Sequence, residues 1–226
     1  MSKRIEQIKK LIDTDKVYTP EKAIELVKKT SNVKFDASVE VHVKLGIDTG
    51  RGDQQVRGTA TLPYGTGKKK KIAVFVQGGS NEEKEAKEAG VQVVGGEELI
   101  SEIGQTGKCD FDIAIATPQI MPKLARIAKI LGPKGLMPNP KAETITTNIK
   151  KAVEDLQKGK ISFKNDDSGN LHQVIGKVSF EDKKILENFN TFIEAVRKAK
   201  PTGVKGIYIR NVSLCSSMGP SVKVGI

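Results

Sequence analysis

The stretch Pro63-Tyr64-Gly65-Thr66-Gly67-Lys68-Lys69-Lys70-Lys71 divides the chain into two parts with different patterns. Proline and glycine favour turns, and a run of four lysines favours solvent, so this stretch predicts a domain boundary. Before it, apolar and polar residues alternate over Ser38–Leu45, which is typical of a strand with one buried face. After it, Ile72–Val76 is apolar without interruption, which is typical of a strand buried on both faces. The two sides therefore predict two different kinds of sheet.

A second boundary is predicted at Gly159, where the pattern changes back. Between the boundaries, apolar strand segments alternate with amphipathic helical segments, which indicates a mainly parallel sheet. We therefore expect an α+β domain, an antiparallel sheet packed with helices, built from residues 1–66 and 160–226. A Rossmann-like, three-layer α/β domain over residues 67–159 is expected to be inserted into it. Gly65, Gly67 and Gly159 form the predicted hinge between them.

Several elements are predicted within this frame. Ile5, Ile8, Leu11 and Ile12 at helical spacing predict a short N-terminal helix, and Thr19-Pro20 predicts the start of the next. In the insert, Met121–Leu131 predicts one basic helix. After the second boundary, Ile161–Lys164 and Leu171–Phe180 predict a hairpin, which an amphipathic helix and two strands follow.

Charge points to a polyanionic partner. The chain carries 38 Lys and Arg against 27 Asp and Glu, for a net charge of +11. The discontinuous domain holds 12 basic and 9 acidic residues in its first part and 11 and 6 in its second, so +8 of the charge lies there. Aromatic residues make up only 4% of the chain, which argues against single-strand binding by base stacking. Phosphates, 2′-hydroxyls and folded shape are the expected targets.

Other classes of protein are disfavoured. No apolar run approaches the 18 or so residues that a membrane span needs, and the N-terminus lacks the apolar core of a signal peptide. Cys109 and Cys215 are isolated and the chain has two histidines, so no disulfide or zinc site is expected, and a reducing cytosol is the default. No other metal or cofactor site is predicted.

A nucleotide-dependent enzyme and a DNA-binding regulator are the alternatives. Val76-Gln77-Gly78-Gly79-Ser80 follows a buried strand and opens a helix, yet neither G-x-G-x-x-G nor a P-loop pattern is present. Glu82 and Glu83 in the first turn would compete with a phosphate for the positive helix end. Asp166-Asp167 is better explained as a hairpin tip than as a catalytic carboxylate pair.

The stretch Ser216-Ser217-Met218-Gly219-Pro220-Ser221 is uncharged but lies in a segment without any acidic residue after Glu194. Small hydroxyl side chains beside a glycine let a backbone approach a partner closely. Taken by itself, the stretch is more typical of a turn between two strands than of a binding site.

Three further features leave alternatives open. The loop Gly132–Pro140 is either a rigid connector or a second contact surface. Phe35, in Lys34-Phe35-Asp36, would by residue type belong to the core. His42 and His172 are expected to make ordinary hydrogen bonds, with His42 on the polar face of its strand.

Three motifs together resemble one known family. They are Lys34-Phe35-Asp36 with Val39-Glu40-Val41-His42, the loop Gly132–Pro140, and Met218-Gly219-Pro220-Ser221. In this order and spacing they resemble the family of the bacterial large-subunit ribosomal protein L-one, and the resemblance extends over essentially the whole chain.

The resemblance implies a function. Members bind folded large-subunit (23S) ribosomal RNA, form the mobile stalk beside the tRNA exit site, assist the movement and release of deacylated tRNA, and repress translation of their own operon mRNA. It implies a cytoplasmic, non-enzymatic protein on the large subunit, monomeric when free. The implied RNA contacts are Lys34, Phe35, Ser38, His172, Ser213, Ser216, Ser217, Met218 and Gly219, with Arg51 and Lys164 as possible tRNA or phosphate contacts. Many relatives have threonines where this chain has Cys215-Ser216-Ser217, and Cys215 is left out because a thiol is a weaker hydrogen-bonding group.

Overall fold

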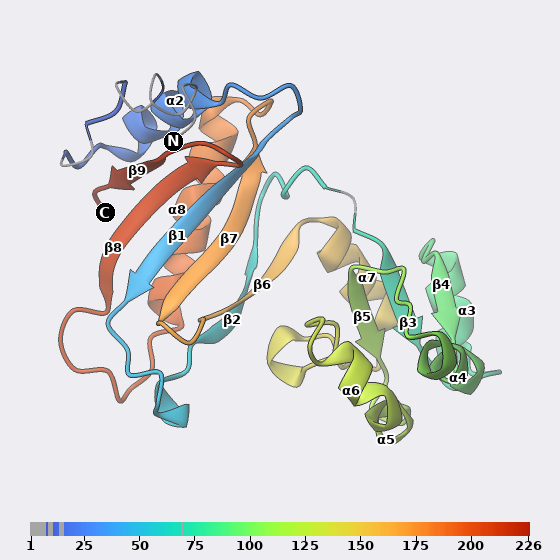
Figure 1. The fold of residues 1–226 in the computed structure, drawn as a ribbon. Coiled ribbons are helices and arrows are strands. Elements are labelled where there is room, and N and C mark those ends of the chain that lie inside the picture. Colours follow the sequence, from blue (N-terminus) through green and yellow to red (C-terminus); the bar gives the residue numbers. More distant parts are fainter. Residues whose placement is uncertain (1–7, 9–10, 14–15, 69) are drawn as a thin grey trace. The chain divides into compact units, whose positions relative to one another are not determined.

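The computed structural model describes residues 8, 11–13, 16–68 and 70–226. Ile5 and much of the predicted N-terminal helix lie outside these residues, as does Lys69 of the lysine run. The chain divides into two compact units, drawn from Met1–Gly67 with Gly159–Ile226 and from Lys68–Lys158. Each unit has its own sheet, helices and hydrophobic core, so the structure confirms a mixed α/β protein (Figure 1).

A four-stranded antiparallel sheet forms the centre of the first unit, in the order β7-β1-β8-β9. Its strands are β1 (Ser38–Leu45), β7 (Asn170–Lys177), β8 (Ile209–Ser216) and β9 (Ser221–Val224). The alternation predicted over Ser38–Leu45 is confirmed, because every second residue of β1 is buried. The strand β1, from the N-terminal part of the chain, therefore lies between two strands from the C-terminal part, β7 and β8.

Two helices pack on the apolar face of this sheet, α2 (Pro20–Thr30) and α8 (Asp182–Lys198). Pro20 takes the first position of α2, and the side chain of Thr19 caps its N-terminus, as predicted. The helix α8 buries an apolar stripe that includes Phe189 and Phe192 in the same core as Val41 and Val43 of β1. In Figure 1, α8 lies behind the sheet. The buried residues of β1 alternate with partly buried ones, so its polar side chains lie on the face away from the core, called the open face below.

The predicted hairpin of Ile161–Lys164 with Leu171–Phe180 is wrong. The strand β6 (Lys160–Lys164) pairs with β2 (Arg57–Thr61) in a separate two-stranded sheet, while β7 pairs with β1. The turn between them is present, with the Gly169 N–H donating to the Asp166 carbonyl, but the strands diverge after it. They diverge because Ile161 and Phe163 enter the core, where the Phe163 ring packs on Phe192 with centroids 5.5 Å apart.

The second unit is built on a parallel sheet in the order β4-β3-β5. Its strands are β3 (Ile72–Phe75), β4 (Val93–Gly95) and β5 (Ile113–Ala116). All four residues of β3 are buried, as an uninterrupted apolar run predicts. Alternate residues enter two separate cores, with Val74 in one and Phe75 in the other, so helices cover both faces of the sheet.

The helices of the second unit differ in detail from the sequence prediction. One face carries α3 (Asn81–Glu88) and α7 (Ile149–Gln157), and the other carries α4 (Glu97–Thr106), α5 (Met121–Leu124) and α6 (Ala128–Leu131). The predicted single helix over Met121–Leu131 is wrong, because the 3₁₀ turn η2 (Ala125–Ile127) separates α5 from α6. Two further 3₁₀ turns are η1 (Gly52–Gln54) and η3 (Pro140–Ala142). Among the described residues, no helix combines the length and apolarity needed to cross a membrane.

Candidate nucleic-acid interface

The open face of the four-stranded sheet collects polar residues from three strands. In the register of the sheet, His42 of β1 stands between His172 of β7 and Ser213 of β8. Ser38 begins the same strand, and the ammonium of Lys177 donates to its hydroxyl at 2.9 Å. The structure therefore brings together Ser38, His172 and Ser213, three of the residues that the family resemblance implies.

A tight turn follows the end of β8. The Gly219 N–H donates to the Ser216 carbonyl at 2.8 Å, and the Ser217 N–H donates to the Ser38 carbonyl at 2.9 Å. Met218 is 71% exposed and has φ of 64°, in the left-handed region that residues other than glycine seldom adopt. This backbone conformation holds a large apolar side chain in solvent at the edge of the open face, where a partner could contact it.

Ser216 faces inward rather than outward. Its side chain is 1% exposed, and its hydroxyl has no hydrogen-bond partner among the described residues. The prediction that this hydroxyl contacts a partner therefore needs correction, because the alternation of β8 turns it toward the core side. A Cβ built on Gly219 would lie 2.3 Å from this hydroxyl oxygen, so Gly219 is required for the close approach of Ser216.

Phe35 does not belong to the core. Its side chain is 57% exposed, which corrects the expectation from residue type, and Lys34 beside it is also exposed. The neighbouring carboxylate explains this: Asp36 accepts hydrogen bonds from the Ser179 N–H at 3.2 Å and from the Ser179 hydroxyl at 2.9 Å. Asp36 thus holds the segment at the start of β1, the same end of the sheet where the turn after β8 lies.

Arg51 and Lys164 lie away from this group. Arg51 is exposed beside η1 and pairs with Asp48 at 3.4 Å, where it lines a pocket of about 400 Å³ with Lys205 and Arg210. Lys164 ends β6 and pairs in register with Arg57, in the two-stranded sheet. Both residues are in the first unit, but neither is on the four-stranded sheet.

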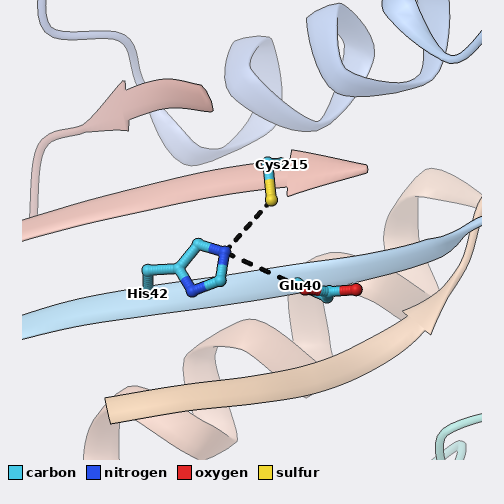
Figure 2. A group of neighbouring side chains, drawn as sticks. All are labelled: Glu40, His42 and Cys215. Atoms are coloured by element: carbon cyan, nitrogen blue, oxygen red, sulfur yellow. Dashed lines mark hydrogen bonds and ion pairs between the residues drawn. The ribbon is translucent and has the colours of Figure 1, made fainter. Parts of the chain in front are cut away.

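A second group of side chains on the open face makes direct contacts that the sequence did not predict (Figure 2). The His42 Nε2 atom lies 3.1 Å from the Cys215 Sγ atom and 4.0 Å from a Glu40 oxygen. The Nδ1 atoms of His42 and His172 are 2.7 Å apart, so one ring donates and the other accepts. The hydroxyl of Ser217 donates to the other Glu40 oxygen at 3.0 Å.

The environment shifts the titration of these groups. Burial, together with the nearby His172, lowers the pKa of His42, and Glu40 partly opposes this. Burial and the charge of Glu40 raise the pKa of the Cys215 thiol to about 11. Asp166, which accepts from the Asn170 N–H and also lies 3.4 Å from His172, has a pKa lowered to about 2. His42 is therefore half-buried and hydrogen-bonded rather than simply solvated.

Glu40 and Cys215 are functional candidates that the sequence prediction missed. The strand alternation already placed Glu40 on the same face as His42. The proximity of Cys215 depends on the pairing of β1 with β8, where Glu40 is opposite Cys215, across 175 residues of sequence. No local pattern signals that pairing.

The three glycines of the predicted hinge all have positive φ, with 62° at Gly65, 76° at Gly67 and 102° at Gly159. A Cβ on Gly159 would lie 2.5 Å from the Cα of Gly65, so two segments of backbone cross there without room for a side chain. Glycine is therefore required for the crossing, and movement about it stays a prediction.

The second unit shows no comparable group of polar side chains among its described residues. The Gly79 N–H donates to Glu83, so the carboxylate occupies the helix end that a nucleotide phosphate would use. Leu136 and Met137 of the loop Gly132–Pro140 pack against the core, and Lys134 donates to the Gly107 carbonyl. These contacts favour the rigid connector over the second contact surface.

Comparison with known proteins identifies the family. The family model described as the ribosomal protein L1p/L10e family matches residues 27–220. The chain belongs to this family. The expectation that it is not an enzyme is confirmed with it, because the family is one of ribosomal proteins.

Curated members of the L1p/L10e family match over almost the whole chain. The large ribosomal subunit protein uL1 of Mycoplasma capricolum is 48% identical over 224 residues, 99% of this chain and 98% of its own length. The protein of that name from Mesoplasma florum is 47% identical over 226 residues, 100% and 98% of the two chains. That from Thermosipho melanesiensis is 48% identical over 223 residues, 99% and 95%.

Proposed function

We propose that the protein is a structural component of the large ribosomal subunit and binds folded large-subunit rRNA through the open face of its four-stranded sheet. The observation that carries this is the convergence of Lys34, Phe35, Ser38 and the turn of Ser217 and Met218 at one end of that face, within the more basic unit. Two exposed apolar side chains beside polar groups suit a ligand with both stacked bases and a sugar-phosphate backbone.

These groups contribute to RNA binding in different ways, according to their chemistry. Lys34 and the other cations of the unit attract phosphates from a distance, and this attraction weakens with salt. The turn of Ser217, Met218 and Gly219 has no charged side chain, so it distinguishes the shape of the RNA and its 2′-hydroxyls. Phe35 and Met218 supply apolar contacts with bases or sugars.

In more detail, we propose that the protein forms the mobile stalk of the large subunit near the tRNA exit site. There the protein would assist the movement and release of deacylated tRNA, with Arg51 and Lys164 as candidate contacts, and Gly65, Gly67 and Gly159 would let the two units reorient. The free protein would be a cytoplasmic monomer and would repress its own operon mRNA through an RNA structure that imitates the ribosomal site.

A competition experiment tests the proposed function. Purified protein is footprinted on total ribosomal RNA, and the protected fragment then competes with duplex DNA of equal length. We expect protection of one folded region of the large-subunit RNA and preference for that fragment over duplex DNA. Equal or stronger binding to duplex DNA would overturn the proposal in favour of a DNA-binding regulator.

Substitutions of two neighbouring residues, Lys34→Gln and Phe35→Ala, distinguish phosphate contacts from apolar contacts. Lys34→Gln should reduce the slope of log K against log salt by about 0.7–0.9, the value for one lost phosphate contact. Phe35→Ala should lower affinity and leave the slope unchanged, because no cation is removed. The measurement is a salt titration of fragment binding for both variants. A reduced slope in Phe35→Ala, or an unchanged slope in Lys34→Gln, would contradict these assignments.

A further inference from the structure

Three side chains on the open face offer three different metal-binding atoms within 4.8 Å of one another: a Glu40 oxygen, the His42 Nε2 and the Cys215 Sγ (Figure 2). Two of them come from β1 and the third from the opposite position on β8. Thiolate sulfur, imidazole nitrogen and carboxylate oxygen are the three ligand types that Zn²⁺ takes in proteins. All three side chains are partly buried, which limits competition from bulk water.

The two distances from the His42 Nε2 atom can be compared with those between the ligands of a tetrahedral ion. Zn–S bonds of about 2.3 Å and Zn–N or Zn–O bonds of about 2.0–2.1 Å place the ligand atoms roughly 3.3–3.6 Å apart. The Nε2 of His42 is 3.1 Å from the sulfur and 4.0 Å from the Glu40 oxygen. The three atoms all lie within 4.8 Å of one another, so the Glu40 and Cys215 side chains would rotate to reach the required separation. Because all three side chains are only partly buried, a fourth ligand could be water.

Hydrogen bonds connect Asp166 to His172 and His172 to His42. Together they place the proton of His42 on Nδ1 and leave Nε2 free to bind a metal. Asp166 only accepts when ionised, so His172 presents its Nε2–H to it. A neutral His172 then has a lone pair on Nδ1, which accepts from the Nδ1–H of His42 at 2.7 Å. His42 is left with its lone pair on Nε2, the atom that faces Cys215 and Glu40. Such carboxylate–histidine support is typical of metal ligands.

Glu40 is held in a similar way. Its Oε1 atom accepts from the Ser217 hydroxyl at 3.0 Å, while Oε2 is the oxygen nearer to His42. One oxygen is thus fixed by the protein and the other is directed at the cluster. Without a metal, the Cys215 thiol donates to the His42 Nε2, which accounts for their short contact.

We propose that Glu40, His42 and Cys215 bind one thiophilic divalent cation of the Zn²⁺ class, with His172 and Asp166 as positioning residues. The site uses this chain's own Cys215 and does not depend on the proposed binding of RNA. Sequence spacing gave no sign of it, because the cysteine and the histidines are far apart in the chain and only the β1–β8 and β1–β7 pairings bring them together.

Cobalt titration tests this site directly. Untagged, reduced protein is titrated with Co²⁺, and thiolate-to-cobalt charge-transfer absorption should rise to saturation at one ion per chain. Cys215→Ser should lose this absorption. Cys109→Ser is the matched control, because Cys109 lies in the second unit, and it should keep the full absorption. His172→Gln should keep the absorption but bind about 10- to 100-fold more weakly, the usual effect of losing a group that supports a ligand.

Several results would overturn the site. These are an absence of charge-transfer absorption with wild-type protein, full absorption in Cys215→Ser, or loss of absorption in Cys109→Ser. X-ray absorption at the zinc edge of the wild-type complex needs no substitution, so it holds even if a variant fails to fold. One sulfur neighbour with nitrogen and oxygen supports the site, and a shell without sulfur refutes it.

Discussion

Gly219→Ala is expected to weaken binding to the protected RNA fragment by about 5- to 150-fold, with little change in the salt slope. The added Cβ would lie 2.3 Å from the Ser216 hydroxyl and 3.2 Å from the Ser216 carbonyl. Overpacking of this kind costs about 1–3 kcal/mol, and each 1.4 kcal/mol corresponds to a factor of ten in affinity. The turn will open to relieve the clash, and the RNA must then restore the bound shape.

The structure gives a reason for glycine at position 219 that lies within the turn itself. The left-handed residue of the turn is Met218, and Gly219 is not among the residues with positive φ. Alanine can therefore adopt the backbone angles of Gly219, and only the space beside Ser216 is lacking. The substitution therefore disturbs a contact within the turn, and the loss of affinity for RNA follows from that disturbance.

A second substitution supplies the control. Ser216→Ala removes a buried hydroxyl that has no partner among the described residues, so by itself it should be almost neutral for stability and binding. In Ser216→Ala/Gly219→Ala the contact at 2.3 Å is removed, and the remaining neighbours of the new Cβ would be the carbonyl oxygen of residue 216 at 3.2 Å and its Cβ at 3.5 Å. Fragment affinity should recover most of the loss. If the double variant binds as poorly as Gly219→Ala, the clash does not explain the defect.

The sequence was sufficient for elements whose pattern is local. The alternation over Ser38–Leu45 and the uninterrupted run at Ile72–Val76 predicted two kinds of strand, and both are present. The hairpin after Gly159 failed, because proximity in sequence favours it while β2 and β1 supply the actual partners of β6 and β7. Competition between distant partners is decided by the whole core and has no local signature.

The candidate interface shows the same limit. Residue types and the family resemblance were enough to select Ser217, Met218 and Gly219, and the structure gathers them with Ser38 at one end of the sheet. They were not enough to decide which hydroxyl is exposed, because the side to which Ser216 points depends on the register of β8. For the same reason the contact between Cys215 and His42 had no sequence signal.

Gly159→Ala is expected to lower the free energy of unfolding of the first unit by about 2–6 kcal/mol, the sum of backbone strain and steric overlap. Its φ of 102° is outside the left-handed region that alanine can reach, and its Cβ would lie 2.5 Å from the Cα of Gly65. The three nearest atoms, the Cα and N of Gly65 and the carbonyl oxygen of Leu62, all belong to the backbone, so no side-chain rotation can relieve the overlap. The two backbone segments must therefore move apart where they cross.

Gly65→Ala is the matched control, because it changes the other glycine of the same crossing. Its φ of 62° lies within the left-handed region, and the nearest atom to its Cβ would be 3.8 Å away. This variant should lose only about 1–2 kcal/mol, the ordinary cost of a left-handed residue with a Cβ. Hydrogen exchange followed by mass spectrometry compares the two variants strand by strand. We expect Gly159→Ala to reduce protection in β1, β7 and β8 while β3 and β5 keep theirs, because the crossing belongs to the first unit alone. Equal losses in the two variants would mean that backbone conformation, and not the lack of space between the segments, determines the requirement for glycine.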